Sequence, residues 1–258
     1  MNTQTTRYTF GHSPTAADRL RIIADFFNPL AVEIIKKNLN TSVQKAADLG
    51  CGPGYTTDML AKATQATQVI GFDISDYFLN IAKRIHPQYS FVQDDVTRLR
   101  SDNKYDYIYC RFLLSHLPDP ENAIALWLKA LSPGGILFID ELENIYTEVP
   151  VFKKYLQTNH ELIRSQGSEL YIGGHLNKYV NGHRCIESRS DTIPVADADA
   201  AGWFYPNTIS IWKDEAYVSK VMNEVEREKI SEELLRIRQR DDKTSNITWK
   251  MKRILLTT

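Results

Sequence analysis

Residues 46–54 place a carboxylate and a glycine turn at the end of a short apolar run. Asp48 is followed by Gly50, Gly52 and Gly54. Glycine tolerates the dihedrals of a tight strand-to-helix turn, and its missing Cβ lets a ligand approach the backbone closely. We therefore interpret this segment as a buried strand that ends in a turn able to hold a nucleotide-like ligand.

The glycine spacing differs from the dinucleotide-binding fingerprint. That fingerprint needs glycine at its first, third and sixth positions, and the sixth position counted from Gly50 is Tyr55. Pro53 also has no backbone N–H, so the turn has one donor fewer. Such a turn suits an anion such as phosphate less well than an uncharged or zwitterionic group. A nicotinamide-dependent oxidoreductase therefore remains only an alternative interpretation.

Acidic residues close the next two apolar runs. Asp73 follows Asp48 by 25 positions (73 − 48), which is one helix and one strand later. Its carboxylate could accept hydrogen bonds from both hydroxyls of a ribose, or it could simply cap the following helix. Asp94 and Asp95 end the third run.

His116 is the candidate catalytic residue, because an unperturbed histidine pKa near 6.5 suits a general base. The alternative is that it holds its loop through backbone hydrogen bonds. His116 and Asp119 have side chains that bind metals, but no third ligand lies nearby in the sequence, so we expect no metal site.

The residues around these groups predict an α/β fold. From about residue 45 to 142, short apolar or β-branched runs alternate with helical patterns, which is typical of βαβ units and a parallel sheet. The predicted strands cover residues 46–49, 68–72, 89–92, 105–110 and 135–139. The predicted helices cover residues 55–63, 76–84 and 120–131.

The flanking regions carry further elements. Apolar residues at helical spacing predict two helices, at 15–27 and 29–39, before the first strand. After the core we expect a helix at 147–165, a strand at 184–192, a helix at 214–240 and a strand at 248–256. The predicted organisation is a helical cover (1–44), a ligand-binding core (45–142), a helical and loop insertion (143–183) and C-terminal strands and a helix that complete the sheet (184–258).

Composition narrows the possible partners. Lys and Arg number 31 against 32 Asp and Glu, so the chain of 258 residues lacks a global basic field, and nucleic acid is an unlikely partner. The three cysteines are widely spaced, which argues against a disulfide framework. No segment resembles a signal peptide or a membrane span, so we expect a cytoplasmic protein, as a monomer or homodimer.

The spacing Asp-x-Gly-x-Gly-x-Gly at 48–54, with the segments 91–96, 105–119 and 131–141, resembles class I S-adenosylmethionine-dependent methyltransferases of the bacterial small-molecule type. The resemblance implies a Rossmann-like, doubly wound sheet of seven strands with helices on both faces. It further implies that most strands are parallel and that the last one is antiparallel beside the fifth. It also implies S-adenosyl-L-methionine as cofactor and S-adenosyl-L-homocysteine as product.

The resemblance assigns the expected cofactor contacts by position. The methionine end would meet the first turn and the end of the fourth strand, the ribose would meet the end of the second strand, and the adenine would meet the end of the third. Asp95 fits the adenine position best, with Asp94 as the alternative register, and N-terminal helices would cover the cofactor. The expected contacts are Tyr8, Arg19, Asp48, Gly50, Cys51, Gly52, Asp73, Ile74, Asp94, Asp95, Val96, Cys110 and Arg111.

The acceptor should bind outside the core, where aromatic and polar residues gather. Candidate pocket residues are Tyr146, Tyr171, His175, Trp203 and Tyr205, although aromatic residues are more often part of the core than of a pocket lining. The hypothesis from sequence is methyl transfer to an oxygen, nitrogen or carbon atom of a small molecule. The alternatives are an NAD-dependent oxidoreductase and a catalytically silent S-adenosylmethionine-binding regulatory protein.

Overall fold

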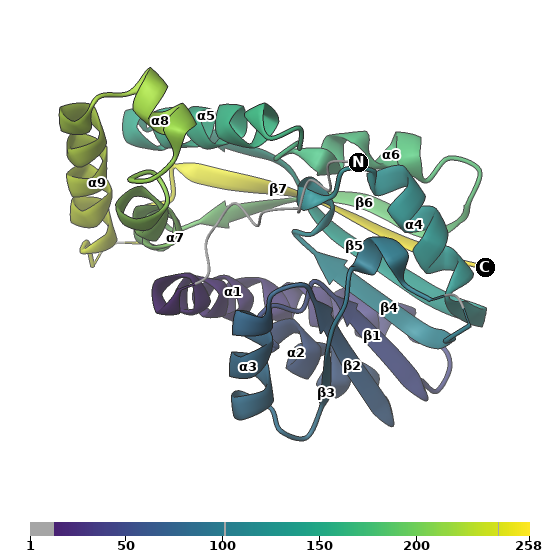
Figure 1. The fold of residues 1–258 in the computed structure, drawn as a ribbon. Coiled ribbons are helices and arrows are strands. Elements are labelled where there is room, and N and C mark those ends of the chain that lie inside the picture. The colour runs from purple at the N-terminus through teal and green to yellow at the C-terminus, as the bar shows by residue number, and fades with distance from the viewer. Residues whose placement is uncertain (1–12, 101, 242) are drawn as a thin grey trace, which may run out of the picture.

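A seven-stranded sheet forms the centre of the protein in a computed structural model, which describes residues 13–100, 102–241 and 243–258 (Figure 1). The strand order is β3-β2-β1-β4-β5-β7-β6. The strands are β1 (Lys45–Leu49), β2 (Gln68–Asp73), β3 (Ser90–Gln93), β4 (Tyr105–Arg111), β5 (Leu131–Thr147), β6 (Arg184–Val195) and β7 (Ile247–Thr257). The strands from β3 to β5 pair in parallel, and β7 pairs antiparallel with both β5 and β6. The predicted fold class is confirmed, including the antiparallel last strand beside the fifth.

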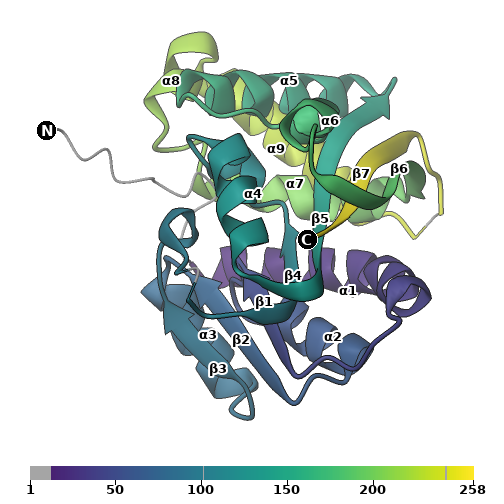
Figure 2. The same cartoon turned by 90° about the vertical axis from the view of Figure 1, so that its right-hand side faces the viewer.

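Helices cover both faces of the sheet (Figure 2). The α-helices are α1 (Pro14–Asn38), α2 (Tyr55–Thr64), α3 (Asp76–Ile85), α4 (Pro120–Lys129), α5 (Pro150–Ser165), α6 (Leu176–Tyr179), α7 (Asp197–Ser210), α8 (Ala216–Val221) and α9 (Glu224–Arg238). Short 3-10 helices are η1 (Val96–Arg98), η2 (Leu114–His116) and η3 (Ile172–His175).

Alternation along β4 shows how the two faces are built. Tyr107 and Tyr109 pack in the cluster with α1 and α2, whereas Ile108 and Cys110 pack in the cluster with α4 and α6. Successive side chains of a strand point to opposite faces, so a strand covered on both sides is apolar throughout.

The first helix corrects the prediction of two helices, because α1 runs without interruption from Pro14 to Asn38. Pro29 lies inside it and removes one backbone hydrogen bond. Phe27 and Ala31, on either side of the proline, are fully buried. Packing of this apolar face compensates for the lost bond, since tertiary contacts supply most helical stability in proteins.

The C-terminal region differs from the prediction in three places. The predicted helix 214–240 is two helices, because Asn223 and Glu226 form a capping box that starts α9 afresh. The sequence did not predict helix α7, because Gly202 and Pro206 within it are residues that disfavour a helix. Strand β5 extends to Thr147, well beyond the predicted 139, because it pairs with β7 up to that residue.

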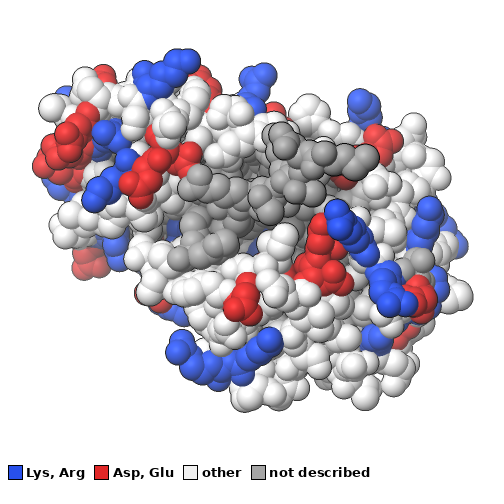
Figure 3. Space-filling model, viewed as in Figure 1, with Lys and Arg blue, Asp and Glu red and all other residues white. Residues whose placement is uncertain are grey.

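Helices α5, α7, α8 and α9 form a lobe above the carboxyl end of the sheet (upper left in Figure 1). The lobe shares one apolar cluster with α1, β5 and β7. In the view of Figure 3, basic and acidic side chains are interspersed over the lobe and the core.

Candidate functional site

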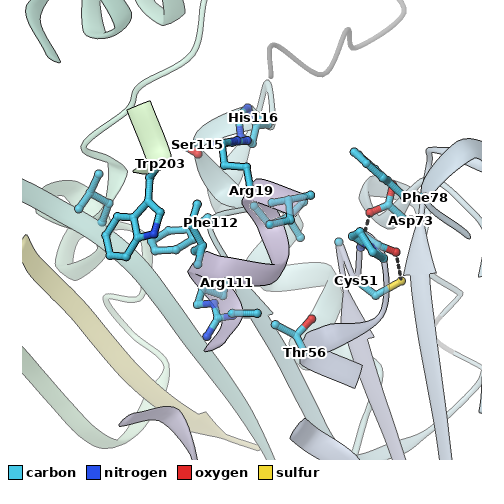
Figure 4. A pocket seen from close by; sticks show the side chains of 18 of the residues that line it. Arg19, Cys51, Thr56, Asp73, Phe78, Arg111, Phe112, Ser115, His116 and Trp203 are labelled. Atoms are coloured by element: carbon cyan, nitrogen blue, oxygen red, sulfur yellow. Dashed lines mark hydrogen bonds between the residues drawn. The ribbon is translucent and has the colours of Figure 1, made fainter. Parts of the chain in front are cut away.

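The candidate site lies where the strand order reverses. Strands β1 and β4 are neighbours in the sheet, while β2 and β3 lie on the other side of β1. In open α/β sheets, ligands bind at this point, beyond the carboxyl ends of the strands. The turn after β1 and the loop after β4 line one continuous pocket there (Figure 4).

The glycine turn brings its backbone to the pocket. Gly50 and Gly52 have φ of 70° and 51°, which disfavours any other residue type. A Cβ on Gly50 would lie 2.8 Å from Leu113 Cδ1, so this glycine permits close packing of the two loops. A Cβ on Gly52 would meet only Leu20 Cδ1, at 3.7 Å, and Gly52 is the position at which the backbone is most open to a ligand.

Asp48 lies behind this turn and does not line the pocket. It is 1% exposed, and its Oδ2 accepts hydrogen bonds from the Thr56 and Thr57 hydroxyls, each at 2.7 Å. Burial raises the pKa of Asp48 to about 6. The carboxyl therefore anchors the start of α2 beneath the turn. Cys110 is likewise buried, on the α4 face of the sheet, and lies outside the lining.

Asp73 lines the pocket at the end of β2. Its Oδ2 accepts from the Gly52 backbone N–H at 2.8 Å, and its Oδ1 accepts from the Ser75 N–H at 2.8 Å. The helix cap of α3 is Ser75, whose hydroxyl accepts from the Phe78 N–H, so the alternative role of Asp73 as that cap is wrong. An ionised carboxylate has about four acceptor positions.

The end of β3 completes this side of the pocket. Asp95 caps η1, and its Oδ1 accepts from the Thr97 N–H at 3.0 Å and the Thr97 hydroxyl at 2.6 Å. Asp94 accepts from the Asp95 N–H at 2.8 Å. The residues of this acidic end are Gly50, Cys51, Gly52, Asp73, Ile74, Asp94, Asp95 and Val96.

Arg19 and His116 lie between the two ends of the pocket (Figure 4). Burial, and secondarily the Arg19 guanidinium, lowers the pKa of His116 to about 4. The imidazole is therefore neutral at physiological pH. Residue Phe112, which begins this loop, has a φ of 52°, a strained conformation that is found mostly at functional sites.

Arg111 ties the pocket walls together. Its Nη2 donates to Asn28 Oδ1 at 2.9 Å, and Asn28 Nδ2 donates to the Tyr55 backbone oxygen at 3.1 Å. Arg111 Nη1 is buried and has no hydrogen-bond partner among the described residues. A buried donor of this kind is available to a bound anionic group.

The far end of the pocket is an aromatic chamber that the sequence predicted only in part. Its residues come from β5, α5, the segment after α5, α7 and β7. They are Leu142, Ile145, Tyr155, Leu156, Asn159, Leu170, Trp203, Phe204, Asn207 and Trp249. Tyr155 and Asn159 are four apart on one helix face, and this spacing was the available signal for them.

Trp203 is the one predicted acceptor residue that lies in this lining. Tyr146 is 52% exposed, at a separate surface hollow. Tyr171 packs its ring edge-on against His160 at 4.9 Å, and the Arg238 guanidinium lies over the Tyr205 ring. His175 is exposed at the end of η3, and Tyr8 lies outside the described residues.

The described part of the chain lacks two further features. Within residues 13–100, 102–241 and 243–258, no group of three or more His, Cys, Asp or Glu side chains is arranged to hold a metal ion. The same residues contain no helix that is both long and apolar enough to cross a membrane.

Residues 46–135 match the family model described as "Methyltransferase domain". This segment of the chain is therefore similar to methyltransferase domains. The chain is 32% identical over 126 residues to a ubiquinone biosynthesis O-methyltransferase of Hydrogenovibrio crunogenus, covering 46% of this chain and 51% of that protein. It is 35% identical over 115 residues to a trans-aconitate 2-methyltransferase of Variovorax paradoxus, covering 44% of each. The chain thus spans about half the length of the curated relatives it matches.

Solved structures share the fold. A putative type II methyltransferase from Anaeromyxobacter dehalogenans aligns with a TM-score of 0.59 and 14% identity, over 88% of this chain and 94% of that one. A coclaurine N-methyltransferase aligns with a TM-score of 0.56 and 13% identity, over 89% and 72%.

Proposed function

We propose that this protein is a methyltransferase that transfers the methyl group of S-adenosylmethionine to a small molecule held in the aromatic chamber. The observation that carries the proposal is the continuity of one pocket from the acidic end to that chamber. Such a pocket holds two reactants next to each other, and alignment of donor and acceptor supplies much of the rate enhancement of a direct displacement.

The acidic end suits the donor's nucleotide part. The Asp73 carboxylate would accept from the ribose hydroxyls, and Asp94 and Asp95 lie where the adenine amine would need an acceptor. Gly52 leaves room for the methionine part. The guanidinium groups of Arg19 and Arg111, including the buried Arg111 Nη1, would pair with its carboxylate. When bound, the sulfonium supplies an electrophilic methyl carbon.

We further propose that His116 takes the proton that the acceptor loses. A lone pair of the acceptor forms the new bond to the methyl carbon, the electron pair of the broken bond stays on sulfur, and the acceptor's proton moves to the imidazole. The lowered pKa keeps this imidazole unprotonated at pH 7, and the same shift makes it a weaker base than an unperturbed histidine. Replacement His116→Gln should reduce kcat while donor affinity stays constant. Loss of donor affinity in that variant would instead support the alternative role of holding the loop.

Donor binding is the direct test of the proposed function. Isothermal titration calorimetry should show micromolar binding of S-adenosylmethionine and S-adenosylhomocysteine, and Asp73→Asn should weaken it about 10–100-fold, because a hydrogen bond to a charged group contributes about 1.5–3 kcal/mol. Asp76→Asn is the matched control, since Asp76 is exposed at the start of α3 and lies outside the lining. Absence of donor binding by the wild type, or NADH binding in its place, would refute the proposal.

A further inference from the structure

The two ends of the pocket differ in charge. Among the described residues that line it, the acids are Asp73, Asp94 and Asp95, and all three lie at the acidic end. The aromatic chamber has only apolar, aromatic and amide side chains, while Arg19 and Arg111 line the region between the ends. A cationic group in the chamber would therefore lose its hydration without gaining a carboxylate partner.

Several aromatic rings of the chamber stack face to face, whereas Trp203 meets Trp249 edge-on at 5.3 Å. Tyr155 stacks on Phe204 at a centroid distance of 4.3 Å and on Trp212 at 5.4 Å, and Phe204 is in turn nearly parallel to Trp249. An aromatic cage for a cation needs ring faces turned toward the ligand, because the negative potential lies on the faces. The faces of Tyr155 and Phe204 meet neighbouring rings in this way, so they are less open to a cation.

Polar groups in the chamber wall add donors. The Tyr155 hydroxyl accepts from Asn207 Nδ2 at 2.6 Å, and burial raises the pKa of Tyr155 to about 12, so its proton stays in place as a donor. The indole N–H of Trp203 is buried without a partner among the described residues, and its nitrogen lies on the side of the ring that faces Phe112 (Figure 4). Such a wall is complementary to oxygen atoms and to the electron-rich face of a ligand ring.

We infer that the methyl acceptor is an uncharged, hydroxylated aromatic molecule, of the phenol or catechol class, and not a protonated amine. This inference rests on the proposed function. In the reaction it implies, a phenol oxygen forms a bond to the methyl carbon, the carbon–sulfur bond breaks with its electrons left on sulfur, and the phenol proton passes to His116. The products are a methyl ether and neutral S-adenosylhomocysteine.

A matched pair of probes tests the charge preference. 4-Ethylcatechol and dopamine share one carbon skeleton and differ by the ammonium group. With the protein saturated by S-adenosylhomocysteine, we expect 4-ethylcatechol to bind at least tenfold more tightly than dopamine in calorimetry. Equal or tighter binding of dopamine, or no binding of 4-ethylcatechol, would overturn the inference. Because donor binding is verified first, failure at that earlier step refutes the proposed function and not the acceptor class alone.

A single substitution tests the cause. Asn207→Asp introduces a carboxylate into the chamber and keeps a hydrogen bond to Tyr155, whose hydroxyl would then donate. The ratio of the dopamine to 4-ethylcatechol affinities should shift at least tenfold toward dopamine, with S-adenosylhomocysteine affinity unchanged. Circular dichroism verifies that the variant folds. The control is Asn177→Asp, which makes the same change at an exposed position. An unchanged ratio in Asn207→Asp would contradict the electrostatic argument.

Discussion

Glu141 offers a quantitative test of how the pocket loop is held. The residue lies on β5 and is fully buried, and its Oε1 accepts from the backbone N–H groups of Leu113 and Leu114 at 2.8 and 2.9 Å. Its Oε2 has no hydrogen-bond partner among the described residues. Burial raises the pKa of Glu141 from 4.5 to about 8. The folded protein therefore retains a proton that the unfolded chain releases.

The substitution Glu141→Gln removes this titration and keeps a carbonyl oxygen for both amides. With the folded pKa raised, the group's contribution to stability is complete below pH 4.5 and is lost as the pH rises through about 8. At 1.36 kcal/mol per pKa unit, the difference approaches a ceiling of about 5 kcal/mol at alkaline pH. We expect Glu141→Gln to become progressively more stable than the wild type between pH 5 and 9.

Urea unfolding of both proteins at a series of pH values measures this effect. Glu143→Gln provides the control on the same strand, because the pKa of Glu143 is lowered by its hydrogen bonds to Lys250 and Ser190, although partial burial opposes this shift. Its contribution is present above the unfolded pKa and lost only in acid, so its variant should differ from the wild type by a constant amount from pH 5 to 9. A constant difference for Glu141→Gln as well would refute the reasoning.

Three further outcomes are expected. Gly50→Ala should destabilise the fold by about 1–3 kcal/mol in urea unfolding, because the residue has a positive φ and the new Cβ would clash with Leu113. Arg253→Met should cost about 3–5 kcal/mol in the same assay, since it leaves the buried Asp140 carboxylate, now 3.1 Å from the Arg253 Nε, without its cation. Cys185 is the exposed thiol of the three cysteines and should react rapidly with a disulfide reagent, followed by absorbance, while the two buried thiols react only on unfolding.

The parallel part of the sheet from β1 to β4 was predictable from sequence because its strands are short runs rich in apolar residues, with polar residues at or near their ends. In a parallel sheet the strand ends meet at one edge, so Asp73 and Asp94 could be placed together without any coordinates. The sequence does not show which way the side chains next to those strand ends point. The Asp48 carboxylate was expected to meet the cofactor, but it lies beneath the turn. The Cys110 thiol points toward the α4 face, and the contact expected from the backbone of Cys110 stays a prediction.

The aromatic chamber could not be assembled from sequence because its contacts join distant segments. Tyr155 and Asn207 are separated by 52 positions and meet through one hydrogen bond between α5 and α7. No local periodicity encodes such a pair. The candidates Tyr146 and Tyr171 had the right composition, but strand alternation and loop packing turn them away from the lining.

The position of the chamber in the chain also limits what similarity can say about the acceptor. The family model ends at residue 135, and every residue of the aromatic chamber lies after it, from Leu142 to Trp249. The glycine turn and the acids at 73, 94 and 95 lie within the matched range. β5 continues past the core because β7 pairs with it as far as Thr147, and this extension carries Leu142 and Ile145 into the chamber wall. The similarity to methyltransferase domains therefore bears on the donor, while the acceptor must be inferred from the charge and ring geometry of this chain's own C-terminal half.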